Sequence, residues 1–137
     1  MTKAIQKTIS KPCHPRFLSE VRALLDEMLT EVALPRREKD LIILAVDEAA
    51  SSMVQYARYK GLESQITLTV DFDDVRFKAC LHDSLNVFEF GGGINAEGLA
   101  REKSYTMGIF LMRRIMDEIS YVYKKGFQND LELIKCL

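Results

Sequence analysis

Glu48, Asp83 and Gly108 are the positions at which residue type and spacing first suggest chemistry. Glu48 lies in an expected helix at the edge of its apolar side, between small alanines. Ser52 and Tyr56 follow at steps of four, so that a carboxylate, a hydroxyl and a phenol share one stripe of the helix. Such a stripe suggests the wall of a cleft, although a partly exposed helix edge gives the same pattern.

Asp83 ends an expected strand in which Val75, Phe77, Ala79 and Leu81 point inward. Asp83 continues this phase, so its carboxylate should face the core side. An ionised carboxylate there needs a hydrogen-bond partner or water, and the amine of a ligand is one such donor. The alternative is a turn at the strand end, in which Asp83 bonds the nearby backbone.

Gly108 opens an expected helix, where free backbone N–H groups can approach an anion. The preceding segment Phe88–Thr106 has no sustained hydrophobic period and contains Gly91, Gly92 and Gly93. Loops of this length are usually functional or mobile. The glycine run predicts the hinge of a lid, and a cradle for phosphate is the alternative.

The elements that position these residues follow one another closely. Two strands with alternating apolar and polar residues are joined by a hairpin at Asp73-Asp74, which gives a sheet with one dry face. The order predicts an α+β fold, a two-layer sandwich of a mainly antiparallel or mixed sheet with helices on one face. The expected helices are Phe17–Val32, Arg36–Tyr59 and Gly108–Asp117, and the expected strands are Ile5–Ile9, Gln65–Phe72, Val75–Asp83, Ile119–Tyr123 and Leu131–Leu137.

Length and composition set the class of protein. A chain of 137 residues with 47% apolar and 28% charged residues predicts a single globular domain over residues 1–137. The net charge of −1 gives no argument for a nucleic-acid partner. No apolar run approaches the roughly 20 residues that cross a bilayer, and three cysteines without CxxC spacing favour neither a disulfide framework nor a zinc knuckle. We therefore expect a cytoplasmic protein without a membrane partner.

The combination of these features resembles the anti-sigma-factor serine/threonine kinase family of the GHKL (histidine-kinase-like) ATPase superfamily. The likeness covers nearly the whole chain. Leu44–Ala50 resembles the helix motif that contains the family's catalytic acid, and Leu81–Glu89 resembles its adenine-binding strand end. Gly108–Glu118 resembles its Gly-Leu-x-Leu-Ile…Met-Asp-Glu helix, and Gly126–Lys135 its last strand.

The resemblance implies roles for individual residues. Glu48 is the implied general base that activates a hydroxyl or water, and Asp83 the acceptor of the adenine amino group. Gly108 lets the helix N-terminus reach phosphates, and Phe88–Met107 is the implied lid over ATP. The implied cofactors are ATP and Mg²⁺. The implied partners are a sigma factor, an antagonist protein that the kinase phosphorylates on serine, and a second copy of the chain in a homodimer.

The sequence departs from the family pattern at several supporting positions. Ser52 stands where the family has its magnesium-binding asparagine, and Tyr56 where it has a histidine. Leu85 and Val87 replace two glycines beside the nucleotide, and Thr106 replaces the first phosphate-binding glycine. We therefore expect weak or absent nucleotide binding, in a regulator that binds a sigma factor or its antagonist. Two alternatives stay open: an active ATP-dependent serine kinase, and a structural α+β subunit without a pocket.

The first candidate surface for a partner is the corner at Leu34, Arg36 and Arg37, next to the helix Phe17–Val32. That helix has more apolar positions than one buried stripe requires, which suggests a second contact surface. A deeply buried helix is the alternative. The apolar positions are Leu18, Val21, Leu24, Leu25, Leu29 and Val32.

Overall fold

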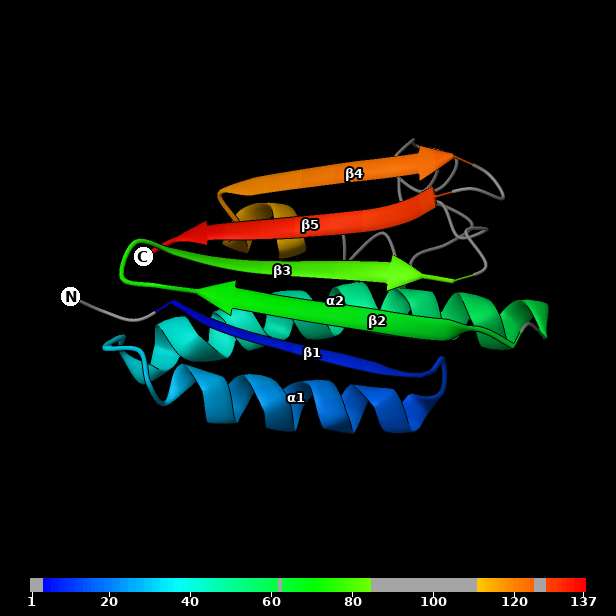
Figure 1. The fold of residues 1–137 in the computed structure, drawn as a ribbon, viewed down its shortest axis with the longest axis horizontal. Helices are drawn as coiled ribbons and strands as arrows, with labels where there is room; N and C mark the ends of the chain where they lie inside the picture. The colour runs from blue at the N-terminus through cyan, green and yellow to red at the C-terminus, as the bar shows by residue number, and fades with distance from the viewer. Residues whose placement is uncertain (1–3, 62, 85–110, 125–127) are drawn as a thin grey trace.

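Five antiparallel strands form one sheet, and the helices lie on one side of it (Figure 1). This computed structural model describes residues 4–61, 63–84, 111–124 and 128–137. The helices are α1 (Pro15–Leu29), α2 (Arg36–Lys60) and a helical segment at residues 111–115. The predicted α+β class is confirmed. In spatial order, the strands are β1 (Ile5–Pro12), β2 (Gln65–Phe72), β3 (Arg76–Asp83), β5 (Gln128–Cys136) and β4 (Glu118–Lys124).

The core lies between the sheet and the helices. Alternate residues of β2 and β3 are buried, and the register places Leu68 opposite Leu81. The opposite face of the sheet carries polar side chains, such as Thr8, whose hydroxyl donates to the Thr69 hydroxyl at 3.2 Å. This division follows from the period of two along each strand, which is why the sequence predicts one dry face correctly.

The junction between β1 and α1 differs from the prediction. Pro12 belongs to β1, because this strand is at the edge of the sheet and its last residue needs no further N–H donor. Pro15 begins α1, because the first helical position has no intrahelical use for an N–H. The N-cap is His14, whose Nδ1 accepts from the backbone N–H of Arg16 at 3.2 Å. α1 therefore begins and ends earlier than expected.

α2 agrees with its predicted bounds to one residue. Gly61 caps it with φ of 64°, a left-handed conformation that favours glycine. Leu41, near the start of α2, is exposed. Among the described residues, no helix combines the length and the apolar character that crossing a membrane requires.

Val75 was expected to point inward but is exposed, because it lies in the β2–β3 turn. The carboxylate of Asp73 builds this turn by accepting from the backbone N–H of Val75 at 2.8 Å and of Arg76 at 2.9 Å. β3 then begins at Arg76. The inward phase from Phe77 to Asp83 is as predicted.

We predict that Asp73→Ala lowers stability in a pH-dependent way. The two backbone hydrogen bonds hold the pKa of Asp73 below its ordinary value. The ionised carboxylate thus contributes stability at neutral pH, and this contribution is lost as pH falls through and below about 4. Urea unfolding at several pH values should show the largest deficit near neutrality.

The matched control is Asp74→Ala, an exposed neighbour in the same turn. A deficit for Asp73→Ala that is independent of pH, or equal for both variants, would contradict this role of Asp73.

Candidate functional site

Ser52 and Asp83 are the buried polar side chains within the described part of the chain, with exposed fractions of 3% and 5%. Ser52 lies on α2 and Asp83 ends β3. α2 packs against β3. Burial of polar groups costs free energy unless they are hydrogen-bonded, and both residues are positions that the sequence assigned to a nucleotide site.

Glu48 is half-buried on α2, one turn before Ser52. Burial raises the pKa of Glu48, and the neighbouring charge of Asp47 raises it further. A raised pKa makes the ionised carboxylate a stronger base than an ordinary glutamate. The role of Glu48 as a general base stays a prediction.

Asp47 connects Glu48 to α1. Its Oδ2 lies 3.7 Å from Nη1 of Arg22, and its buried Oδ1 has no hydrogen-bond partner within the described residues. Burial raises the pKa of Asp47, and the charge of Arg22 opposes this rise. The sequence analysis did not single out Asp47, although two consecutive acidic residues at the edge of a helix could have indicated it. The contact with Arg22 comes from tertiary packing.

Ser52 is directed along its own helix. Its hydroxyl donates to the backbone carbonyl of Glu48 at 2.9 Å, one turn back along α2. Magnesium requires oxygen ligands in near-octahedral geometry, and a serine offers a single oxygen on a short side chain. The described residues contain no group of three His, Cys, Asp or Glu side chains that could hold a metal ion.

Asp83 lies near Cys13, which follows β1. The thiol of Cys13 donates to the carbonyl of Met53 at 3.6 Å, and its pKa is raised first by burial and also by the charge of Asp83, against a lowering hydrogen bond with Ser64. An open cavity of about 660 Å³ adjoins this end of the sheet. Its lining includes Cys13, Ser64 and Ser84. Nothing in the sequence signals that Cys13 lies close to Asp83, because seventy residues separate them.

The residues predicted for the lid and for the contacts with adenine and phosphate lie in part outside the described residues. Those that lie outside are the lid glycines Gly91, Gly92 and Gly93, the helix-opening Gly108, and the substituted positions Leu85, Val87 and Thr106. Within the described part, Glu48 and Ser52 lie one turn apart on α2, and Asp83 ends β3.

The histidine kinase-like ATPase domain family matches residues 12–135, which is most of the sequence. This chain belongs to that family. The matched segment begins at the end of β1 and ends within β5, so it includes both α2 with Glu48 and β3 with Asp83. Among curated proteins, none matches this sequence significantly.

The apolar side chains of α1 pack into the core of this histidine kinase-like ATPase domain. Val21, Leu25 and Leu29 are buried, and Leu18 and Leu24 are partly buried against them. Val32 and Leu34, beyond the helix end, also pack partly against the core. A surplus apolar stripe on α1 therefore gives no support to partner binding there.

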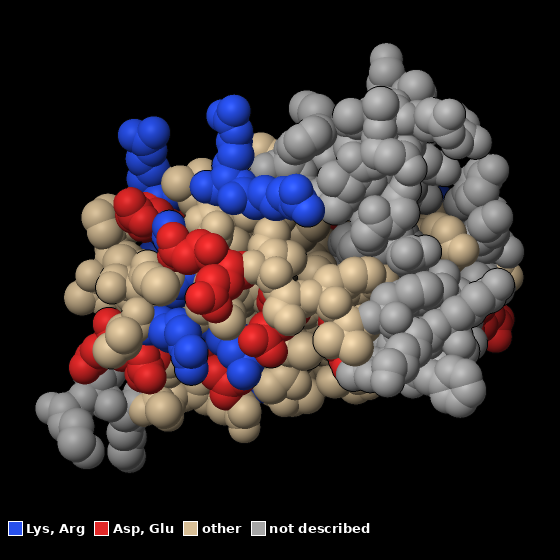
Figure 2. All heavy atoms as spheres, turned by 90° about the horizontal axis from the view of Figure 1, so that it is seen from above, with Lys and Arg blue, Asp and Glu red and all other residues tan. Residues whose placement is uncertain are grey.

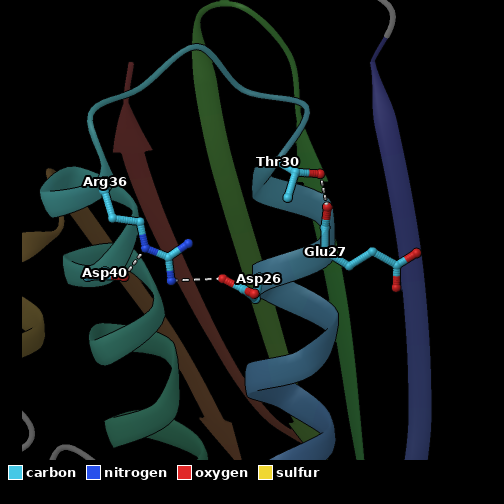
Figure 3. A network of polar contacts seen from close by, with 5 residues as sticks. All are labelled: Asp26, Glu27, Thr30, Arg36 and Asp40. Carbon is cyan, nitrogen blue, oxygen red and sulfur yellow. Dashed lines mark hydrogen bonds and ion pairs between the residues drawn. The ribbon is translucent and has the colours of Figure 1, made fainter.

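Arg36 connects the two helices at the same corner (Figure 3). Its Nη2 lies 2.9 Å from Asp26 of α1, and its Nε lies 2.9 Å from Asp40 of α2. These two carboxylates raise the pKa of the Arg36 guanidinium. Arg37 is exposed and forms no ion pair within the described residues. Arg37 is therefore the arginine of this corner whose charge is exposed without an ion-pair partner among the described residues.

Charged side chains of both signs are interspersed on the described part of the face seen in Figure 2. The lysines and arginines there alternate with aspartates and glutamates. This part of the face therefore carries no extended area of one sign.

We predict that Ser52→Ala and Ser52→Asn differ sharply in stability. Ser52→Ala removes one hydrogen bond to a helix carbonyl and should cost about 1 kcal/mol or less. Ser52→Asn must place a larger side chain in a buried site and should cost about 1–3 kcal/mol. Thermal and urea unfolding of both variants would measure these costs, and equal costs would mean that the site around Ser52 accepts the larger residue.

Proposed function

We propose that this chain is a regulatory protein of the anti-sigma-factor type, which binds a sigma factor or its antagonist and binds nucleotide weakly. Membership of the histidine kinase-like ATPase family supports a nucleotide-related origin. The observation that carries the proposal is Ser52. The family's metal-ligand position holds a hydroxyl that is buried and hydrogen-bonded to its own helix.

This observation matters because phosphoryl transfer depends on positioning and charge stabilisation, to which the metal contributes most directly. Without a ligand at position 52, Glu48 alone cannot supply that stabilisation. Leu85 and Val87 replace family glycines next to the expected nucleotide, and side chains there would occupy space that the family leaves to the ligand. Protein binding depends on a patch of surface side chains and need not decline with the pocket.

An active ATP-dependent serine kinase is the second candidate, and Glu48 favours it. A half-buried carboxylate with a raised pKa can accept the proton of a serine hydroxyl as that oxygen attacks the γ-phosphorus. Only the ionised form is a base. As the pH falls, this activity should therefore be lost at a higher pH than it would be with a glutamate of ordinary pKa.

We predict that ATP binds weakly to the wild-type chain. Isothermal titration calorimetry with ATP and Mg²⁺ should show little heat at micromolar protein. Asp83→Asn, which loses the implied acceptor of the adenine amine, should remove any residual binding. The variant Ser52→Asn with Leu85→Gly and Val87→Gly should bind more tightly, provided that circular dichroism shows it to be folded.

Tight, magnesium-dependent binding by the wild type, at about micromolar dissociation constant or below, would contradict this proposal. Transfer of labelled phosphate from ATP to a serine of a captured antagonist would then establish the kinase alternative.

We predict that partner binding is separable from nucleotide binding. Affinity capture from lysate, with identification by mass spectrometry, should recover a sigma factor or its antagonist with the wild type and equally with Asp83→Asn. Arg37→Ala should reduce capture more than Arg36→Ala, because Arg36 is already held by Asp26 and Asp40. Recovery of neither partner, or loss of capture with Asp83→Asn, would contradict the proposed function.

A further inference from the structure

The sheet has two edge strands, β1 and β4, and β1 carries the features that protect an edge. An edge strand presents unpaired backbone N–H and C=O groups, and natural proteins discourage further pairing there with inward-pointing charges and with proline. Lys7 of β1 points toward the helices, since its Nζ lies 3.5 Å from Glu27 of α1. Lys11 faces α1 as well, because it lines a cavity together with Phe17. Pro12 then ends this protected strand.

The centre of β4 lacks such protection. The five residues from Ile119 to Tyr123 include neither a charge nor a proline, and four of them are β-branched or aromatic, which favours strand pairing. Val122 is 42% exposed. Within the described part of the chain, β4 pairs with β5 alone and lies at the outside of the sheet (Figure 1). Its outer edge is therefore the one at which the sheet can be extended.

The side chains of β4 define which strand fits this edge. Ile119 and Tyr121 are partly buried against the core, whereas Ser120 and Val122 are exposed on the opposite face. An added strand in register would extend both faces if its apolar and polar side chains alternated in the same way. Such a strand would also cover the part of Ile119 and Tyr121 that the core leaves exposed.

The beginning of β4 is acidic, which sets the charge of the fitting strand. Glu118 is exposed at the first position of β4, and the side chain of Asp117 precedes it. On the side that is already paired, Lys135 of β5 places its Nζ 3.7 Å from Asp117. The existing neighbour of β4 thus brings a basic residue to this end, and opposite charges across strands favour pairing.

We propose that the outer edge of β4 binds an extended segment of a partner protein as an additional antiparallel strand, with a basic residue opposite Glu118. Backbone hydrogen bonds supply the affinity in this mode of recognition, and the alternating side chains supply the specificity. The antiparallel direction continues the pattern of the whole sheet. The proposal goes beyond the proposed function, because it uses neither the nucleotide site nor the corner at Arg37.

An extended segment fits this edge better than a second folded domain does. β4 has seven residues, and two domains that met only along this strand would bury much less than the roughly 1,200 Å² of stable complexes. An extended segment follows the twist of the strand and satisfies its outward N–H and C=O groups along the full length.

The test is an NMR titration of the full chain with the capped peptide Thr-Val-Thr-Val-Thr-Val-Lys, whose lysine lies opposite Glu118 in the antiparallel register. Shift changes should centre on β4, with a dissociation constant of about 1 mM or below. Hydrogen exchange should slow at the outward N–H groups of β4 while the protection of β5 stays unchanged. This second readout separates addition of a strand from replacement of β5.

A charge exchange gives the sharpest outcome. Glu118→Lys should weaken binding of this peptide about fivefold, because an attractive cross-strand pair becomes a repulsive one. A peptide that ends in glutamate in place of lysine should show the reverse preference and bind the variant more tightly than the wild type. Thr8→Lys, an exposed change on the other edge strand, is the matched control and should leave binding unchanged.

Several results would each overturn the proposal. These are no binding up to about 1 mM peptide, shift changes on β1 in place of β4, loss of protection in β5, and no exchange of preference between the two peptides. An apparent affinity that falls as the protein concentration rises would show that a second copy occupies the edge. None of these readouts uses ATP or a sigma factor, so a failure here is distinguishable from a failure of the proposed function.

Discussion

The contact between α2 and the sheet is the constraint on which the candidate site depends. The buried side of α2 contains small residues, including Ala45 and Ala49, and β3 presents Ala79 within the same core. Small side chains allow a helix and a sheet to approach closely. Ser52 on this helix and Asp83 at the end of β3 are the buried polar residues of the described part. A bulkier residue at the buried Ala49 would disturb the core on this side of α2.

Electrostatics around Glu48 depend on the second helix contact, between α1 and α2. The charge of Arg22 on α1 opposes the rise in the pKa of Asp47 that burial causes, and the pKa of Glu48 is raised first by burial and further by the charge of Asp47. The helix pair is further joined by Arg36, whose guanidinium connects Asp26 to Asp40. Exposed ion pairs of this kind contribute little stability individually. Their effect is on the relative position of the helices, and through Asp47 on the proton affinity of the candidate base.

The site combines retained and altered features of its family. In the proposed function, Asp83 and Glu48 are the retained residues, and the altered one is Ser52, whose hydroxyl donates to its own helix. The scaffold does not require the altered positions, since the core consists of apolar residues on other faces of the same elements. A fold of this kind can therefore keep its shape and its surfaces while its pocket changes.

The sequence alone determined the α+β class, the two strands around the Asp73 turn, the bounds of α2 to one residue, and the inward direction of Asp83. These features follow from local periodicity, since alternation of two or recurrence of three to four depends only on neighbouring residues. Glu48 and Asp83 were found because each is a polar residue at the end or edge of such a pattern. The sequence analysis misplaced Pro12 of β1, Pro15 of α1 and the exposed Val75, although these features are local as well. At Pro12 the edge of the sheet decided between two permitted conformations, and at Val75 the Asp73 carboxylate did.

Only the tertiary structure decided what surrounds these residues. Arg22 beside Asp47 and Cys13 near Asp83 join segments that are far apart in the chain, and no spacing rule relates them. The surplus apolar residues of α1 prove to be core, while Leu41 and Leu44 of α2 are exposed. The physical reason is that a periodic pattern shows which side of a helix is apolar but not how many neighbours cover it. Coverage depends on the packing of all elements together.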